Sequence, residues 1–458
     1  MINQLKKSHF EQTWENTPPG YALVPCRRQE FDGISELIYA PIKYDHSPIS
    51  LSQNKIPSSE WTNKSFLEFV RGEFGSPSHI EESPPKPPNW DREITNVDIA
   101  TEYLKQCESN FVYSGLVDAI TQNCTNMSEK IFTIFGNALL GNKDNVKFLD
   151  KSYFFKSLEP LLKNQLRLRF LIPSFPFKDQ CIFRTASPPS NVDLGEIAQI
   201  IHLHTLALAL YQVHPYGADW IIVSDGYAYA DMLRVDIDKV DEYQHQLKWF
   251  RNFLNLFGTV SIIDLKEMTT RLEREQEKTG LFEKTFEKIY NILKKSAHPN
   301  NMTIYKSFRV LVRGMKKNIN LKDIINDIEW DDHWLILNAE SKEDIRSDLK
   351  EIWETVDEIT VEASFKYVAF NLAIRFLEIY QKLLPYSLRA TIHSKKGQIA
   401  VPCLGSVYPW NGVGVLSSDN GNIIIKTMPL HSLVKKNTNV VECHLENKNS
   451  PFFYKIST

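Results

Sequence analysis

The chain has 458 residues, a formal net charge of -3 and 24% charged residues, so no excess of positive charge points to a nucleic-acid-binding protein. No apolar run reaches the roughly 18 residues that a membrane span requires. The first residues, MINQLKKSHFEQTWEN, lack the apolar core of a secretory signal. Six cysteines without CxxC spacing favour reduced thiols in a cytoplasmic protein over a zinc module or a disulfide scaffold.

The beginning of the chain differs from the rest in its proline content. Of 23 prolines, 11 lie in residues 1–90 and 12 in the other 368 residues. Proline fixes its own φ and restricts its predecessor to extended conformations. Large apolar residues such as Trp61, Phe66 and Phe69 are too frequent here for a fully disordered segment. We therefore predict an extended N-terminal arm, residues 1–92, that docks onto the main body.

The next segments predict a parallel β-sheet core. Apolar residues at helical spacing predict a helical lead-in over residues 93–165. The run Leu166–Ile172, stopped by Pro173, predicts a strand, and Asp193–Val213 predicts a long helix capped by Asp193 and Glu196. A second buried strand follows at Asp219–Val223. A strand, a helix and a strand in this order indicate a βαβ unit with parallel strands.

In the second half of the chain, the spacing of apolar residues changes once, from helical spacing to strict alternation. Residues 236–385 are predicted to be mostly helical, and after Pro385 the apolar period becomes two. Predicted antiparallel strands there are Leu388–His393, Gln398–Pro402, Gly412–Leu416 and Ile423–Thr427. The predicted fold class is α/β, with a Rossmann-like core of mostly parallel strands in residues 166–458. A helical insertion at about 250–385 and C-terminal antiparallel strands complete that core.

Several charged residues are predicted to gather at one edge of the sheet. Both strands of the βαβ unit end in polar loops at the carboxyl edge, where α/β proteins place ligands. This edge brings Lys178 and Arg184 near Asp225 and Asp231. A lysine can hold an anion or act as an amine nucleophile, and paired carboxylates suit base chemistry or amine recognition. Surface and turn roles for these residues remain open.

A second pair of candidates lies in the predicted strand Leu388–His393. Arg389 and His393 fall on the same face of this strand, as an anion clamp and a general acid or base. A structural role is equally open. His202 and His204 point to different faces of one helix, so they are poor joint metal ligands. No metal and no cofactor is expected.

Together these motifs resemble a known family. IPSFPFKD (Ile172–Asp179), Arg184, DLGE (Asp193–Glu196) and YGADWIIVSDGYAYAD (Tyr216–Asp231) occur in the order of the pyoverdine/dityrosine biosynthesis family. This family includes the isonitrile (isocyanide) synthases and their spore-wall relatives. LRATIH (Leu388–His393), YPWNGV (Tyr408–Val413) and the late SPFFYKI are similar to further family motifs. The resemblance runs from about Val97 onward and is loose over residues 250–385.

The resemblance implies an activity and its substrates. Bacterial members convert the α-amine of L-tyrosine or L-tryptophan to an isonitrile, taking the extra carbon from ribulose 5-phosphate through an imine. It also implies a downstream iron(II)/2-oxoglutarate oxygenase as a pathway partner. Two alternatives stay open: a dityrosine-type enzyme that gives an N-formyl amino acid, and a non-catalytic module that binds a phosphosugar or an amino acid.

The resemblance also implies roles for individual residues. The implied catalytic residues are Lys178, Asp225, Asp231 and His393, and the implied substrate-binding residues are Arg184, Glu196, Ser224, Arg389, Trp410 and Asn411. Glu196 has the alternative of capping a helix. Asn411 stands where the family usually has histidine, so any acid–base task of that histidine would fall to His393 or water.

Overall fold

The computed structural model describes most of the chain from residue 94 onward, together with the backbone of a short hairpin before it. The described residues are 21–31, 34–43, 94–136, 151–179, 184–185, 188–233, 235–256, 258–296, 365–391, 399–401, 404–405, 407–419, 422–436, 439–445 and 450–456.

A parallel five-stranded sheet forms the centre of the molecule. Its spatial order is β5-β4-β3-β6-β7, with β3 Leu168–Pro173, β4 Ala218–Ser224, β5 Val260–Asp264, β6 Ser387–Thr391 and β7 Ile399–Ala400. All four pairings in this sheet are parallel. The first of these strands lies in the middle and later strands are added on either side, which is the doubly wound arrangement. The predicted Rossmann-like core is confirmed.

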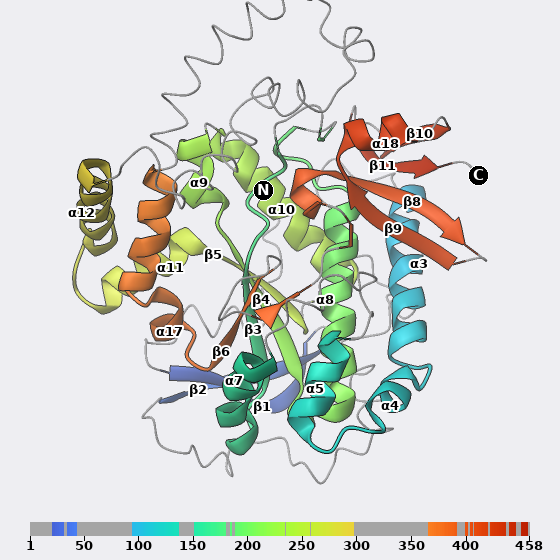
Figure 1. The fold of residues 1–458 in the computed structure, drawn as a ribbon, viewed down its shortest axis with the longest axis horizontal. Helices are drawn as coiled ribbons and strands as arrows, with labels where there is room; N and C mark the ends of the chain where they lie inside the picture. Colours follow the sequence, from blue (N-terminus) through green and yellow to red (C-terminus); the bar gives the residue numbers. More distant parts are fainter. Residues whose placement is uncertain are drawn as a thin grey trace, which may run out of the picture.

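Helices cover both faces of this sheet (Figure 1). On one side lie α8 (Leu194–Val213) and α10 (Ile237–Phe253), with α3 (Ile94–Phe111) and α5 (Met127–Gly136) packed on α8. On the other lie α11 (Leu265–Glu275), α17 (Ile379–Leu383) and α12 (Leu281–Ser296). The remaining helices are α4 Leu116–Thr121, α7 Lys151–Lys163 and α9 Gly226–Leu233. Strands β3 and β4 are therefore buried, which explains their mostly apolar sequences; the buried Arg169 of β3 is paired with Asp219 of β4.

Helix α8 is the central core helix. Asp193 caps it in a capping box with Glu196, as the sequence predicts. Within the described residues it is the one helix long and apolar enough to cross a membrane, with a mean hydropathy of 1.2. All of that window is buried inside the protein, however, as is usual for the core helix of an α/β fold.

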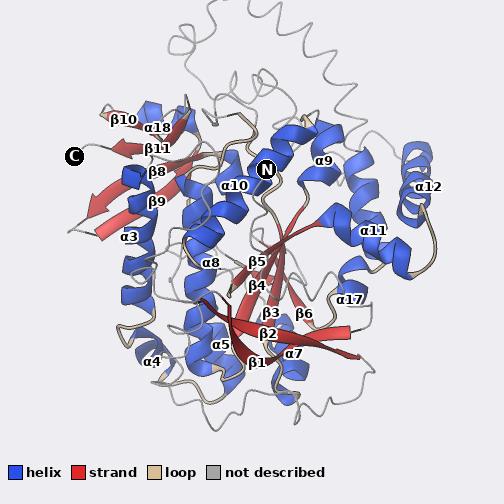
Figure 2. Cartoon of the chain, turned by 180° about the vertical axis from the view of Figure 1, so that it is seen from behind, coloured by secondary structure: helices blue, strands red, loops and turns tan. Residues whose placement is uncertain are grey.

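A second, smaller sheet packs beside α8 and α3 (Figure 2). Its order is β10-β11-β8-β9, with β8 Val413–Asp419, β9 Asn422–Met428, β10 Val440–His444 and β11 Pro451–Ile456; α18 spans Leu430–Lys436. The pairs β8–β9 and β10–β11 are antiparallel, whereas β11 and β8 are parallel. It meets α8 where Gly195 and Gly414 touch, since a Cβ on Gly414 would lie 2.5 Å from the Gly195 nitrogen.

Two strand predictions need correction. Residues 260–264 were expected to lie in a mostly helical region, but they form β5, which pairs with β4. Five residues are too few to show a period, and helices on both sides obscure the signal. The strands near 388 and 399 were expected to be antiparallel, but β6 and β7 are parallel members of the main sheet. Alternation identifies a strand but not its partner.

Part of the predicted N-terminal arm is ordered as a β-hairpin. Strands β1 (Tyr21–Phe31) and β2 (Ile34–Lys43) pair antiparallel, and Figure 2 draws them at the lower end of the central sheet. The other residues of the predicted arm lie outside the described residues, so its boundary at residue 92 stays a prediction.

Candidate active site

The strand order defines where a ligand would bind. Chain connections run from β3 through β4 to β5 on one side, and β6 lies on the other side of β3. The sheet therefore has its topological switch point between β3 and β6, and ligands of such sheets bind outside the carboxyl ends of the strands at that point. The candidate residues that follow β3 and β4, and those on β6, all belong to this edge.

The loop after β3 is held in a strained conformation. Phe175 has φ 57°, a left-handed conformation that a bulky side chain rarely adopts. Its carbonyl oxygen accepts hydrogen bonds from Gln244 Nε2 at 2.8 Å and Ser224 Oγ at 3.1 Å. Its ring packs against Trp410 with a centroid distance of 5.0 Å. Ser224 and Trp410, both predicted to bind substrate, are thus engaged in holding this loop.

The turn after β4 packs tightly against the same loop. Gly226 is the first residue of α9, and a Cβ there would lie 2.2 Å from the carbonyl oxygen of Pro176. Only glycine permits this approach. The SDG sequence therefore joins the loops that follow β3 and β4 and fixes the position of the intervening Asp225.

Lys178 lies in a closed ionic cluster. Its Nζ is 2.7 Å from Asp193 Oδ2, 2.8 Å from Glu196 Oε1 and 3.1 Å from the carbonyl oxygen of Pro409. The side chain is 0% exposed. Tyr243 donates a further hydrogen bond to Glu196 at 3.2 Å. The ammonium group thus donates its hydrogen bonds to protein acceptors. The cluster joins the β3 loop, the start of α8 and the turn before β8.

Burial and neighbouring opposite charges have opposing effects on the pKa values of Lys178 and Glu196 in this cluster. Burial alone lowers the pKa of Lys178, but the adjacent Asp193 and Glu196 carboxylates together raise that pKa above its usual value. Burial raises the pKa of Glu196 well above its usual value, against the effect of the Lys178 charge, and Asp193 raises it further. Two carboxylates share one ammonium here, so we assign the charge on Lys178 as permanent, and the raised pKa of Glu196 means that the pair holds a proton more readily than free carboxylates do.

Asp225 lies among three tyrosines from different elements. It is half-buried and follows β4, while Tyr229 belongs to α9, Tyr367 to the helical residues 365–376 and Tyr380 to α17. The Tyr229 and Tyr367 rings are 5.0 Å apart, and Asn371 Nδ2 lies 3.3 Å from the Tyr229 hydroxyl. We refer to Asp225, Tyr229, Tyr367 and Tyr380 as the Asp225–tyrosine cluster.

Electrostatics confirms that these four side chains form one group. Burial raises the pKa of all three tyrosines, and the negative charge of Asp225 raises each of them further. For Tyr367 the result is a pKa of about 12. All three hydroxyls therefore stay protonated at neutral pH, and a protonated hydroxyl can donate a hydrogen bond.

Arg389 stands beside this cluster on β6. It is in register with Leu171 of β3, directly at the switch point. Its guanidinium carbon lies 4.4 Å from the centre of the Tyr380 ring. Its Nη1 atom is buried and has no hydrogen-bond partner among the described residues. An arginine nitrogen in this state is ready to receive an anionic oxygen.

The remaining candidates are only partly defined. Arg184 is half-buried, and its Nε is buried without a hydrogen-bond partner in the described part of the chain. Asn411 lies in the short turn η3 (Pro409–Asn411), where its backbone nitrogen donates to Tyr408. The side chain of Asp231 and the whole of His393 lie outside the described residues. Among the described residues, no three His, Cys, Asp or Glu side chains converge as metal ligands do.

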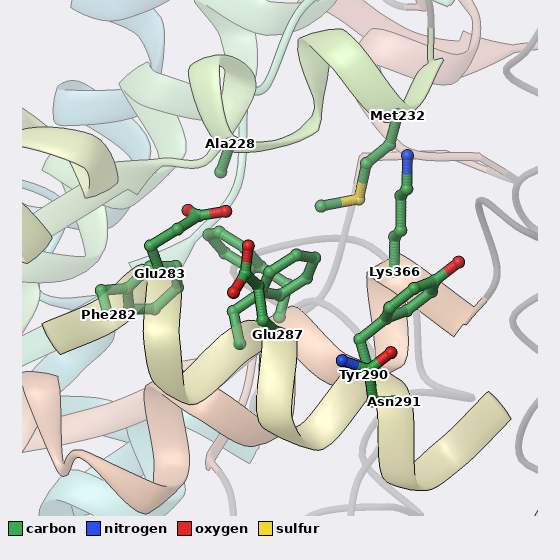
Figure 3. Close-up of a pocket in the computed structure, with 10 residues that line it drawn as sticks. Ala228, Met232, Phe282, Glu283, Glu287, Tyr290, Asn291 and Lys366 are labelled. Atoms are coloured by element: carbon green, nitrogen blue, oxygen red, sulfur yellow. The ribbon is translucent and has the colours of Figure 1, made fainter. Parts of the chain in front are cut away.

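Figure 3 shows a cavity of about 590 Å³ whose lining includes Lys366 and Phe370, from the same helical residues as Tyr367. It is bounded by α9, α12 and the helical residues 365–376, and its walls include Met232, Phe282, Phe286 and Phe370. Phe370 also contacts Tyr229, with ring centroids 5.5 Å apart, so the cavity and the cluster are neighbours. Glu283, Glu287 and Lys366 line the cavity as well and add charge to it.

Comparison with known proteins assigns the family. Residues 158–440 match the family model described as pyoverdine/dityrosine biosynthesis protein. The chain belongs to this family. The matched range contains the β3 loop, the Lys178 cluster, the Asp225–tyrosine cluster and Arg389, so the candidate site lies wholly within it. The resemblance noted in the sequence is confirmed.

Two relatives extend this result. A 95-residue stretch is 34% identical to isocyanide synthase xanB of Aspergillus fumigatus and covers 21% of this chain and 12% of that protein. The match thus spans about an eighth of the length of that relative. The crystal structure of the PvcA protein from Pseudomonas aeruginosa superposes with a TM-score of 0.51 over 72% of this chain and 100% of PvcA. At 13% identity this likeness shows the fold.

Sequence reasoning missed the tyrosines around Asp225. Tyr229 lies inside the YGADWIIVSDGYAYAD motif, three residues after Gly226, and helical spacing from Asp225 was the available signal. Tyr367 and Tyr380 lie in the region that resembles the family only loosely, and no motif marks them.

Proposed function

We propose that the chain is an isonitrile (isocyanide) synthase that acts on the α-amino group of an aromatic amino acid, L-tyrosine or L-tryptophan, with ribulose 5-phosphate as the carbon donor. Family membership supports the reaction class. The observation that supports the site most strongly is the placement of Asp225 and Arg389 beside the same tyrosine at the switch point. One group suits an ammonium ion and the other suits an anionic oxygen.

In this proposal the first step is imine formation. The amine attacks the ketone carbon of the sugar, and water leaves. Asp225 receives the ammonium ion and accepts a proton from it, because a neutral amine is needed for attack. The three tyrosine hydroxyls are donors that can hydrogen-bond to the carbonyl oxygen as it gains charge. Arg184 and Arg389 are the proposed anion-binding groups, and Asp231 and His393 keep their proposed acid–base roles.

Our proposal gives Lys178 and Glu196 a different task. A lysine that acts as a nucleophile must lose its proton, but the carboxylates around Lys178 favour the charged form. Its position also leaves no exposed surface for a substrate. We therefore propose that Lys178 and Glu196 organise the site, by joining the β3 loop to α8, rather than contact the substrate.

The cavity beside the cluster supports an aromatic substrate. Its volume lies within the range of ordinary small-molecule sites, and its walls include the aromatic side chains Phe282, Phe286, Tyr290 and Phe370. We propose that the substrate side chain occupies this cavity. We further propose that the product is consumed by an iron(II)/2-oxoglutarate oxygenase in the cytoplasm.

The test is a product analysis of the purified protein. The protein is incubated with ribulose 5-phosphate uniformly labelled with ¹³C and, separately, with each of the common amino acids. Mass spectrometry should show one labelled carbon on the nitrogen of an aromatic amino acid. An N-formyl product would be heavier than the isonitrile by one water molecule and would favour the dityrosine-type reaction. Consumption of no amino acid would exclude both reactions and favour a binding module.

A further inference from the structure

Tyr380 lies on a short element that is held rigidly at both ends. Helix α17 has only five residues, Ile379–Leu383, and connects the helical residues 365–376 to β6. Glu378 just before it has φ 52°, and Tyr386 just after it has φ 64°. Such left-handed conformations are unfavourable for residues with a side chain, and they persist where the surrounding structure determines them. They often mark functional sites.

The Tyr380 ring determines where the Arg389 guanidinium can lie. The guanidinium carbon is 4.4 Å from the ring centre, within the distance of a cation–π contact. Arg389 projects from β6, whose register with β3 is fixed at Leu171. One end of the arginine side chain is thus set by the sheet and the other by the ring. The buried Nη1 still lacks a hydrogen-bond partner among the described residues.

Tyr380 is also close to the negative charge of Asp225. Arg389 lowers the pKa of the Tyr380 hydroxyl and Asp225 raises it, so both charges lie near this side chain. An α-amino acid carries an anionic and a cationic group separated by one carbon atom. Two protein groups of opposite charge near one residue match that pattern.

We propose that Tyr380 is a positioning residue that holds Arg389 for the carboxylate of the amino acid, while Asp225 takes the amine. This inference rests on the proposed function, and it assigns the carboxylate to Arg389 rather than to Lys178, whose donors are used within the protein. The sugar phosphate shares the same anionic chemistry, so the experiment separates the two sources.

The experiment measures binding by calorimetry for L-tyrosine, for tyramine, which lacks the carboxylate, and for ribulose 5-phosphate. The pair L-tryptophan and tryptamine is measured in the same way. In Tyr380→Leu the amino acid should bind about tenfold more weakly, because the ring that orients the guanidinium is lost. Tyramine and ribulose 5-phosphate should change by less than about twofold. Tyr380→Phe keeps the ring and should restore amino-acid binding to within about threefold of the wild type.

The control is Tyr216→Phe, whose hydroxyl donates to Gln165 in an exposed position and should leave binding unchanged. Arg389→Gln should reproduce the same selective loss if Tyr380→Leu does not fold. Three results would overturn the inference. The first is an equal loss of affinity for L-tyrosine and tyramine in Tyr380→Leu, and the second is a loss confined to ribulose 5-phosphate. The third is a wild type that binds neither aromatic amino acid.

The binding and product measurements distinguish failure of the proposed function from failure of the role of Tyr380. If the wild type binds L-tyrosine better than tyramine but forms no isonitrile, the reaction is wrong and the binding site stands. If the wild type forms isonitrile while Tyr380→Leu binds L-tyrosine normally, the reaction stands and the role of Tyr380 is wrong.

Discussion

Single residues of the proposed site divide between those that hold it together and those that would face the proposed substrate. Lys178 and Asp225 both come from motifs of the family, but their surroundings differ. Lys178 is enclosed by Asp193, Glu196 and the Pro409 carbonyl, whereas Asp225 is half-buried among tyrosine hydroxyls. Substitutions at the two positions should therefore affect different properties, namely stability and turnover.

Lys178→Met should destabilise the fold. The substitution leaves two buried carboxylates without their counter-charge, and removing one partner of such a cluster costs about 3–5 kcal/mol. Urea denaturation should show this loss, and the additional change Glu196→Gln should recover part of it by removing one uncompensated charge. A loss below about 1 kcal/mol in Lys178→Met would contradict the assigned pairing.

Asp225→Asn should abolish turnover and leave the fold intact. The amide cannot accept a proton from the amine, and loss of a positioned base typically lowers the rate by about 10²–10⁴-fold. Steady-state kinetics and circular dichroism measure the two effects. The matched control is Asp236→Asn, an exposed aspartate paired with Lys239, which should behave as the wild type. Retention of full turnover in Asp225→Asn would remove Asp225 from the mechanism.

At the scale of elements, helix α8 and its C-terminal end carry two buried histidines that make the stability of the fold depend on pH. His202 lies in the middle of this helix and bonds to the Tyr103 hydroxyl of α3. Burial lowers the pKa of His202 to about 3. For His214, at the end of α8, burial lowers the pKa to about 4, and the Arg167 charge lowers it as well. Both imidazoles are therefore neutral in the folded protein at moderately acidic pH.

The stability should fall as the pH drops from about 6.5 to about 4. The unfolded chain takes up protons on these histidines near pH 6.5, but the folded chain does not, so acid favours unfolding in this window. His202→Gln should reduce this fall by about 2 to 3 kcal/mol, as measured by denaturation at several pH values. His444→Gln, on the partly exposed strand β10, is the control. An unchanged pH profile in His202→Gln would show that His202 is protonated or accessible in the fold.

Elements also show what sequence can predict. Asp193 and Glu196 predicted the start of α8 because a capping box is local, and Leu166–Ile172 predicted β3 because the run is rich in apolar residues and is stopped by Pro173. The parallel pairing of β6 with β3 was not predictable, since Arg389 and Leu171 meet through tertiary contacts. The same holds for Tyr380, which comes near Asp225 only through the tertiary packing of α17 against α11.

At the scale of the whole molecule, the smaller sheet meets the core helix α8 at a close backbone contact. Gly195 lies in the first turn of α8 and Gly414 lies on β8, and the two backbones touch without side chains between them. Gly414→Ala would place a methyl group 2.5 Å from the Gly195 nitrogen, so the smaller sheet would have to shift. Overpacking of this kind costs about 1–3 kcal/mol.

The shift of the smaller sheet in Gly414→Ala should also reduce turnover. The turn before β8 supplies the Pro409 carbonyl to Lys178 and the Trp410 ring to Phe175, so displacement of β8 disturbs the β3 loop. Thermal melting and product formation should both fall in Gly414→Ala. Ser418→Ala, at the exposed end of β8, serves as the control. A Gly414→Ala protein that melts and turns over as the wild type does would show that the two sheets can separate without consequence.

The connection between the sheets also has a consequence for how the chain becomes active. Lys178 bonds to the Pro409 carbonyl across 231 positions of sequence, and Gly414 bonds to Asp193 across 221. Contacts so distant close large loops and form late during folding. On a ribosome that adds about 5–20 residues per second, the partners of Lys178 appear tens of seconds apart. Through that interval the nascent β3 loop lacks its contacts with Pro409 and Trp410, so the protein should gain its proposed function in a single late event.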